Sequence, residues 1–397
     1  MPVSKPRLRR AALFAVPLLT LGLAACGGGG GSDDSIDMPI AFTVIGQADF
    51  TGYLSNRGSS VNALGFAQQF GGIATNGTMF YVADYSNHRI LGWNSIPASS
   101  TTAPDFVIGQ TDFTSGSSGT SATQLALPSS VSITDTHLVV ADSGNNRVLI
   151  WNTLPTANTP PNVVLGQASF TTGDTGTSAS ALNTPVSAMI ANNRLFVADQ
   201  FNNRVLIWNT LPTVSGTAAD VVLGQPAFGP DYVAIGAEEE GLNNPGSLWT
   251  DGLRLLVADS GNNRVMYWSS VPRTNGTAAT YEIGQTDFSR TSAGVGQAAL
   301  RTPYGVTSDG TSIYVADAYN NRVLKFDSFP IANGSSAVEV YGQNTYSANT
   351  PDDDDQDGTK DDNPSDRTLS LPTGVTVYNG VLYVSDTSNH RVLYFTD

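Results

Sequence analysis

The sequence is built on one recurring phrase, which first reads Val82-Ala83-Asp84-Tyr85-Ser86-Asn87-His88-Arg89. The phrase returns five times, at intervals of 58, 57, 60, 58 and 69 residues, with its aspartate at Asp142, Asp199, Asp259, Asp317 and Asp386. A regular period indicates a repeat architecture, in which each copy is one structural unit that buries its apolar face against its neighbours. The chain therefore contains six similar units.

Each copy has the features of four short antiparallel strands. One follows a proline fourteen residues before the aspartate, one ends at the aspartate, one starts at the arginine, and one ends at a Gly-Gln step such as Gly109-Gln110. Phe70 replaces the proline in the first copy. These runs are rich in β-branched and aromatic residues, as is typical of strands. Because four-stranded units repeated radially form a propeller, the sequence predicts an all-β fold with six blades.

The two ends of the repeat region predict how the ring closes. The region begins with a lone fourth strand, Phe42 to Gly46, and finishes at Asp397 after a third strand. The first strand can therefore complete the last blade, which leaves no partial blade with an unpaired edge. We expect a monomeric six-bladed propeller over residues 41–397.

The recurring phrase also points to a family. The copy Tyr314-Val315-Ala316-Asp317-Ala318-Tyr319-Asn320-Asn321-Arg322-Val323 resembles the signature of the NHL repeat, and the resemblance runs from about residue 41 to the end of the chain. It implies a six-bladed propeller. It does not imply one function, because the family includes sensors, scaffolds, RNA-binding proteins and one class of lyase.

Residues 1–25 have the features of a bacterial lipoprotein signal peptide. Four basic residues lie within the first ten positions, and an apolar run extends from Ala11 to Ala25. Leu23-Ala24-Ala25-Cys26 is similar to a lipobox, so Cys26 is the predicted lipidation site and residues 26–40 form a glycine-rich tether. An ordinary signal peptide followed by a chance cysteine is the alternative. We expect a lipid-anchored, extracytoplasmic protein of the bacterial envelope, with the outer membrane favoured because Gly27 rather than aspartate follows the cysteine.

The charge of the mature chain restricts its partners. Removal of residues 1–25 leaves 15 basic and 34 acidic residues, a net charge of −19. Such a protein repels nucleic acid and anionic lipid headgroups, so we expect no nucleic-acid partner. Cys26 is the only cysteine, and the propeller therefore has neither a disulfide nor a thiol nucleophile.

Residues shared by all six copies are expected to serve the fold. The aspartate should accept hydrogen bonds from turn amides, an asparagine after it should adopt a left-handed conformation, and the aspartate and arginine should form a charge-assisted staple. An aromatic residue lies nine positions after each aspartate. A carbohydrate platform is one interpretation of this set, but packing between blades is favoured; the residues are Trp93, Trp151, Trp208, Trp268, Phe326 and Phe395.

The loop before the last inner strand is the longest, with 29 residues where three other copies have 18. Four of its aspartates match ligand positions of a calcium-binding loop that turns at Gly358: Asp353, Asp355, Asp357 and Asp361. The stretch resembles the Asp-rich calcium repeats of secreted bacterial proteins and of thrombospondins. Its twelfth position is Pro364, so Asp362 or Asp366 would have to supply the last ligand. A solvated acidic insertion is the alternative.

Two classes of six-bladed propeller enzyme provide the alternative function, namely amidating lyases and calcium-dependent lactonases. A zinc site of the lyase type requires clustered histidines, and the chain has only His88, His137 and His390, two of which replace an asparagine of the repeated phrase. The expected channel-lining strands contain no charged residue. We therefore expect a non-catalytic binding or scaffolding propeller whose long-loop face meets a protein, peptide or glycan, with a metal-dependent hydrolase or lyase as the alternative.

Overall fold

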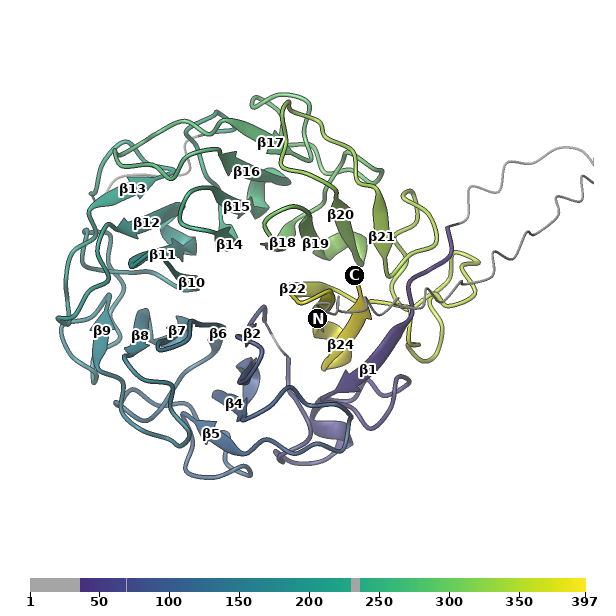
Figure 1. Ribbon diagram of the computed structural model, residues 1–397, viewed down its shortest axis with the longest axis horizontal. Coiled ribbons are helices and arrows are strands. Elements are labelled where there is room, and N and C mark those ends of the chain that lie inside the picture. Colours follow the sequence, from purple (N-terminus) through teal and green to yellow (C-terminus); the bar gives the residue numbers. More distant parts are fainter. Residues whose placement is uncertain (1–35, 69, 230–235) are drawn as a thin grey trace, which may run out of the picture. The chain divides into compact units, whose positions relative to one another are not determined.

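A computed structural model describes residues 36–68, 70–229 and 236–397. This part of the chain forms six four-stranded antiparallel sheets arranged around a central axis (Figure 1). Helical structure in the described residues is limited to short 3₁₀ turns. The predicted all-β, six-bladed propeller is confirmed.

The strands occupy the positions that the repeat predicts. The inner strands line the axis: β2 (Ile73–Thr75), β6 (Pro128–Ile133), β10 (Pro185–Ala191), β14 (Pro245–Thr250), β18 (Pro303–Ser308) and β22 (Pro372–Tyr378). The second strands end at the repeated aspartate: β3 (Phe80–Asp84), β7 (Leu138–Asp142), β11 (Arg194–Asp199), β15 (Leu255–Asp259), β19 (Ile313–Asp317) and β23 (Val381–Asp386). The third strands start at the arginine: β4 (Arg89–Trp93), β8 (Arg147–Trp151), β12 (Arg204–Trp208), β16 (Arg264–Trp268), β20 (Arg322–Phe326) and β24 (Arg391–Thr396). The outer strands are short: β5 (Phe106–Ile108), β9 (Val163–Leu165), β13 (Val221–Leu223), β17 (Tyr281–Ile283), β21 (Glu339–Tyr341) and β1 (Ala41–Ile45).

Blades 1 to 5 each consist of four consecutive strands, beginning with β2–β5. Blade 6 combines β22, β23 and β24 with β1, in which Ala41 lies opposite Phe395 and Ile45 opposite Val392. Closure of the last blade by the first strand is therefore confirmed. The strand begins and ends one residue earlier than the sequence pattern indicates.

The aromatic residues of the third strands are buried between blades. Trp208 of blade 3 is 1% exposed and shares a hydrophobic cluster with Val139 and Ile150 of blade 2. Its indole N–H donates to the carbonyl oxygen of Thr217 at 3.0 Å, so the polar atom of the ring is satisfied. The packing interpretation of these aromatic residues is confirmed.

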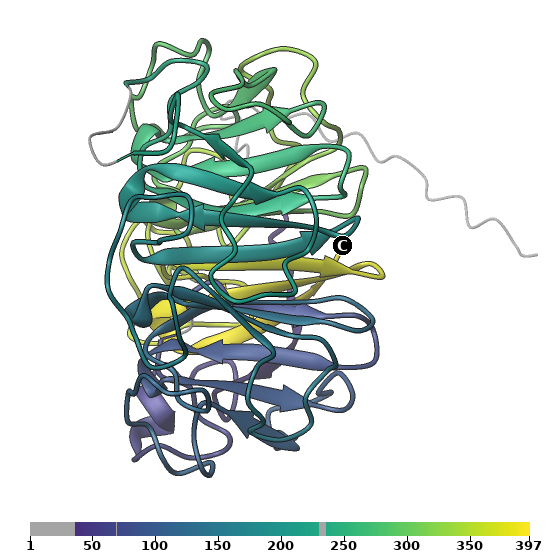
Figure 2. The same ribbon diagram turned by 90° about the vertical axis from the view of Figure 1, so that its left-hand side faces the viewer.

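The two faces of the propeller differ. One face, on the left in Figure 2, carries the 3₁₀ turns between second and third strands together with the loops that connect one blade to the next. The chain ends on the opposite face, to the right. We call these the long-loop face and the short-loop face.

Candidate functional site

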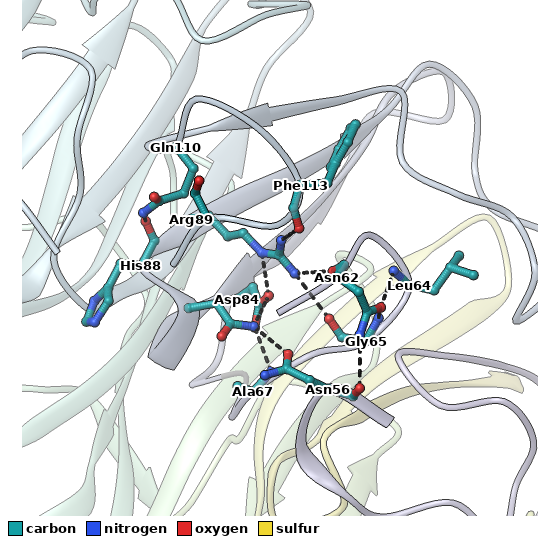
Figure 3. Close-up of polar contacts among 12 residues, drawn as sticks. Asn56, Asn62, Leu64, Gly65, Ala67, Asp84, His88, Arg89, Gln110 and Phe113 are labelled. Atoms are coloured by element: carbon teal, nitrogen blue, oxygen red, sulfur yellow. Dashed lines mark hydrogen bonds and ion pairs between the residues drawn. The ribbon is translucent and has the colours of Figure 1, made fainter. Parts of the chain in front are cut away.

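A buried ion pair lies beneath the 3₁₀ turn of every blade. In blade 1, Nε of Arg89 donates to Oδ2 of Asp84 at 2.7 Å, and neither side chain is exposed (Figure 3). Asp84 also accepts from the amide of Asn87 and from the backbone N–H of Ala67, at 2.8 and 2.7 Å. The predicted staple is confirmed, although the backbone donor belongs to the end of a long loop and not to the turn. The equivalent pairs are Asp142–Arg147, Asp199–Arg204, Asp259–Arg264, Asp317–Arg322 and Asp386–Arg391.

The arginine of each pair also binds the ends of the long loops. Nη1 of Arg89 donates to the carbonyl oxygen of Phe113 at 2.6 Å, in the loop that leaves blade 1. Nη2 donates to the carbonyl oxygens of Asn62 and Gly65, in the loop that enters it. Blades 2, 4, 5 and 6 repeat this two-sided arrangement. In blade 3, both Nη atoms of Arg204 bind the entering loop.

The staple of blade 6 has an acidic neighbour. Burial raises the pKa of Asp386 to about 6, and the nearby carboxylate of Asp352 contributes to this increase. Asp352 is buried, accepts a hydrogen bond from the amide of Asn389 at 2.8 Å, and forms an ion pair of 3.1 Å with Lys360. The Asp-rich loop therefore contributes one carboxylate to the interior of blade 6, which the sequence pattern does not reveal.

A second repeated contact joins each blade to the next, and we call it the seam latch. The residue before the repeated arginine is left-handed, with φ of 50° at Asn146. Its side-chain oxygen accepts a hydrogen bond from the backbone N–H of Thr184, which precedes the inner strand of the next blade, at 2.8 Å. His88 and His390 do the same through ring Nδ1, at 3.0 and 2.8 Å. The prediction that these histidines replace an asparagine of the phrase is confirmed.

The inner strands enclose a central channel of about 220 Å³. Its described lining is made of apolar, glycine and hydroxyl residues. Oγ of Ser130, Ser187 and Ser247 each accepts a backbone N–H from the next inner strand. Blades 5, 6 and 1 have glycine at this position, and a Cβ on Gly374 would lie 2.4 Å from the carbonyl oxygen of Gly71. One half of the channel is thus bridged by serines and the other half by direct backbone contact.

Aromatic residues occupy the long-loop end of the channel. The rings of Phe70 and Tyr304 pack edge to face at 4.8 Å, and Phe70 also packs against Tyr85 at 5.3 Å. The amide of Gln200 donates to the Tyr304 hydroxyl at 3.1 Å. Our sequence reasoning missed this cluster because it treated the repeat positions as equivalent. The signal was Phe70 in place of the inner-strand proline, together with the residue types directly after that proline and directly after the repeated aspartate, which differ from blade to blade.

Three of the four predicted calcium ligands lie together in the Asp-rich loop. Carboxylate oxygens of Asp353, Asp355 and Asp361 lie within 4.8 Å of one another. Asp353 is buried, and burial raises the pKa of its carboxyl group. The carboxylate of Asp357 instead accepts a hydrogen bond from the backbone N–H of Thr359 at 2.8 Å. The three clustered carboxylates are oxygen ligands of the kind that calcium prefers.

The same loop contacts the chain where it enters the propeller. The backbone N–H of Ile36 donates to the carbonyl oxygen of Asn344 at 2.6 Å, and that of Ala41 donates to the carbonyl oxygen of Asp366 at 2.7 Å. Cys26 and the predicted signal peptide lie outside the described residues. Within the described ranges, no helix is both long and apolar enough to cross a bilayer.

Comparisons with known proteins agree with this fold. The family model of the NHL repeat matches residues 369–395, which cover β22, β23 and most of β24. No curated protein matches the sequence. An auxiliary nutrient binding protein from Bacteroides thetaiotaomicron has a similar structure, with a TM-score of 0.51 and 11% identity over 88% of this chain and 75% of that one.

Two further solved structures have lower scores. Hydrazine synthase from Kuenenia stuttgartiensis gives a TM-score of 0.48 at 11% identity, covering 87% of this chain and 99% of that chain. Virginiamycin B lyase from Staphylococcus aureus gives 0.44 at 11% identity, covering 83% and 96%. At 11% identity, the likeness to the nutrient binding protein concerns the fold alone. This protein is a six-bladed β-propeller with an NHL repeat in its last blade.

Proposed function

We propose that this protein is a non-catalytic binding or scaffolding propeller, which presents its long-loop face to a protein, peptide or glycan partner in the bacterial envelope. One observation carries the proposal. The buried arginines fix the ends of the long loops, while the loops between them vary from 18 to 29 residues in length. Variable loops on a rigid scaffold are a common location of binding sites.

Site-specific photo-crosslinking in cells tests which face meets a partner. A photoreactive residue would replace Tyr319, which is 54% exposed on the long-loop face, or Ile331, which is 88% exposed on the short-loop face. We expect adducts of defined mass from position 319 and none of the same mass from position 331. Equal labelling from the two positions would contradict the proposal.

The membrane tether is the second part of the proposal. The mature chain would be attached through a lipid on Cys26, with residues 26–40 as the spacer. Cys26→Ser should release the propeller from the membrane fraction into the soluble fraction. Retention of that variant in membranes would rule out this anchor.

Calcium binding by the Asp-rich loop is the third part, supported by the three clustered carboxylates. Titration calorimetry should detect calcium binding to the wild-type protein and to Asp112→Asn, which changes an exposed aspartate on another long loop. Asp355→Asn should lose the heat signal, because it removes one of the three oxygen ligands. Absence of heat in the wild type would identify the loop as acidic surface only.

A further inference from the structure

The non-repeated residues at the channel mouth distinguish alternate blades. Three positions are compared: the residue that follows the inner-strand proline position and the first two residues after the repeated aspartate. Blades 1, 3 and 5 each have at least one large residue at these positions, namely Tyr85, Gln200 with Phe201, and Tyr304 with Tyr319. Phe70 adds to blade 1, where it replaces the proline of the other five blades. At the three compared positions, the other three blades have only small residues. These are Ser129, Ser143 and Gly144 in blade 2, Gly246, Ser260 and Gly261 in blade 4, and Thr373, Thr387 and Ser388 in blade 6. A feature confined to alternate blades is not required by the fold.

The large residues form one surface across the axis. Phe70 of blade 1 packs on Tyr304 of blade 5, and the amide of Gln200 in blade 3 reaches the hydroxyl of the same tyrosine. Phe201 and Tyr319, which lie in the 3₁₀ turns η4 (Gln200–Asn202) and η6 (Ala318–Asn320), are 58% and 54% exposed. A half-buried aromatic floor therefore lies on the long-loop face, and the same face carries two exposed rings.

The long loops of this face carry a strongly negative charge. The six segments between a Gly-Gln step and the next inner strand contain 16 acidic and five basic residues, a net charge of −11. Residues 352–366 and the run Glu238 to Glu240 account for most of the acidic groups. Loops of one sign raise the local concentration of ligands of the opposite sign.

One of the exposed rings already has a cationic neighbour. The guanidinium carbon of Arg301 lies 6.0 Å from the centroid of the Tyr319 ring. Aromatic faces attract guanidinium and ammonium groups at this separation. Rings of this kind, on a face whose long loops carry a net negative charge, have the chemistry that recognises Arg and Lys side chains.

We propose that the channel mouth, comprising Tyr85, Phe201, Tyr304 and Tyr319 with the floor residue Phe70, binds a basic segment of a polypeptide. This inference rests on the proposed binding function and names its partner class. Arg or Lys side chains of the partner lie against Phe201 and Tyr319, while the acidic loops attract the segment from a distance. A neutral glycan could stack on the same rings but would gain nothing from the charge of the loops.

Fluorescence anisotropy with labelled probes tests the proposal on the mature protein. The probes are a peptide of alternating Arg, Lys and Gly residues, the same peptide with Glu in place of the basic residues, and a neutral maltooligosaccharide. The double variant Phe201→Ala/Tyr319→Ala changes only exposed side chains, and Val214→Ala/Ile331→Ala is the matched control on the short-loop face. Circular dichroism melting curves show whether each variant is folded.

We expect the basic peptide to bind, with an affinity that falls as salt is raised. Loss of both mouth rings should weaken binding by about ten-fold, and the control should bind as the wild type does. Unchanged binding of the basic peptide by the mouth variant would overturn the proposal. If only the oligosaccharide binds, and its binding depends on the rings, the proposed partner class is wrong but the binding function stands. Crosslinking without preference for either face, in the experiment described above, would contradict the binding function itself.

Discussion

Two of the six seams between blades are latched by histidine and four by asparagine. The asparagine latches join blades 2 to 3, 3 to 4, 4 to 5 and 5 to 6, through Asn146, Asn203, Asn263 and Asn321. His88 joins blade 1 to blade 2, and His390 joins blade 6 to blade 1. Both histidine latches therefore border the same blade, which is also the one where Phe70 replaces the inner-strand proline.

The comparison shows that the same hydrogen bond to a backbone N–H can be accepted by an amide oxygen or by a ring nitrogen, and that these two acceptors respond differently to acid. A neutral imidazole Nδ1 accepts the backbone N–H as the asparagine oxygen does, but protonation removes that lone pair. Burial lowers the pKa of His88 and of His390, and the carboxylate of Asp84 acts in the opposite direction on His88. Blade 1 is thus the blade whose two seams depend on pH.

The largest effect is expected from loss of the Asp–Arg ion pair, which lies within every blade, whichever kind of latch joins that blade to the next. Arg147→Ala leaves Asp142 as a buried, unpaired carboxylate and frees the loop carbonyls that the guanidinium binds. We expect the free energy of unfolding to fall by about 3–5 kcal/mol. Urea denaturation measures it. Arg89→Ala in blade 1 should cost a similar amount, and a much milder effect there would show that blade 1 is not held as the other blades are.

Acid should destabilise the wild-type protein through the histidine latches. Because the folded-state pKa of each ring lies below its value in the unfolded chain, the latch contribution is complete above about pH 6.5 and is lost as pH falls through the folded-state pKa. Each broken latch should cost about 1 kcal/mol.

The matched variant for this comparison is His88→Asn/His390→Asn, which gives blade 1 the latches of the other blades. Its stability at pH 5 should exceed that of the wild type by about 2 kcal/mol, with little difference at pH 7.5. The raised pKa of Asp386 makes the folded state relatively more stable in acid, which is opposite to the effect of the histidines. Asp386 is present in both proteins, so its contribution cancels when their free energies of unfolding are compared. Parallel pH profiles of the two proteins would show that the histidines do not carry the effect.

The smallest effect is expected from the reverse exchange in an asparagine seam. Asn146→His should preserve the left-handed turn and the acceptor for the N–H of Thr184 at neutral pH. Below about pH 6.5 it should add about 1 kcal/mol of acid destabilisation. Thermal melts at pH 7.5 and pH 5 measure it. A variant that is equally destabilised at both pH values would show that histidine does not fit this seam.

The sequence predicts the blade count, the strand positions and the Asp–Arg staple, because these features recur in every copy of the repeat. Closure by the first strand was predictable because the repeat region begins with a lone fourth strand and finishes after a third. The latch partners were not predictable. The donor is the backbone N–H of a residue 38 to 50 positions later in five seams and 322 positions earlier in the seam of His390. The donor residues Leu127 and Thr184 have unlike side chains, so no residue type marks the position.

The candidate sites were only partly predictable for a related reason. The calcium-loop pattern correctly singles out Asp353, Asp355 and Asp361 as neighbours, since the turn between them is local. The burial of Asp352 depends on Asn389, 37 residues later at the turn of blade 6, and the channel mouth depends on blades 1, 3 and 5 meeting across the axis. Such contacts are set by packing between distant segments rather than by local sequence.

Closure by β1 also has a consequence for the order of synthesis. The strand leaves the ribosome before every other part of the propeller, yet its partner β24 emerges only after all the other strands. Until then Val44 and Ile45, which are buried in the finished blade, belong to an unpaired strand edge. Contacts of such long sequence separation form slowly. Until β24 has emerged, residues 41–45 are therefore an unpaired strand at which the nascent chain can aggregate.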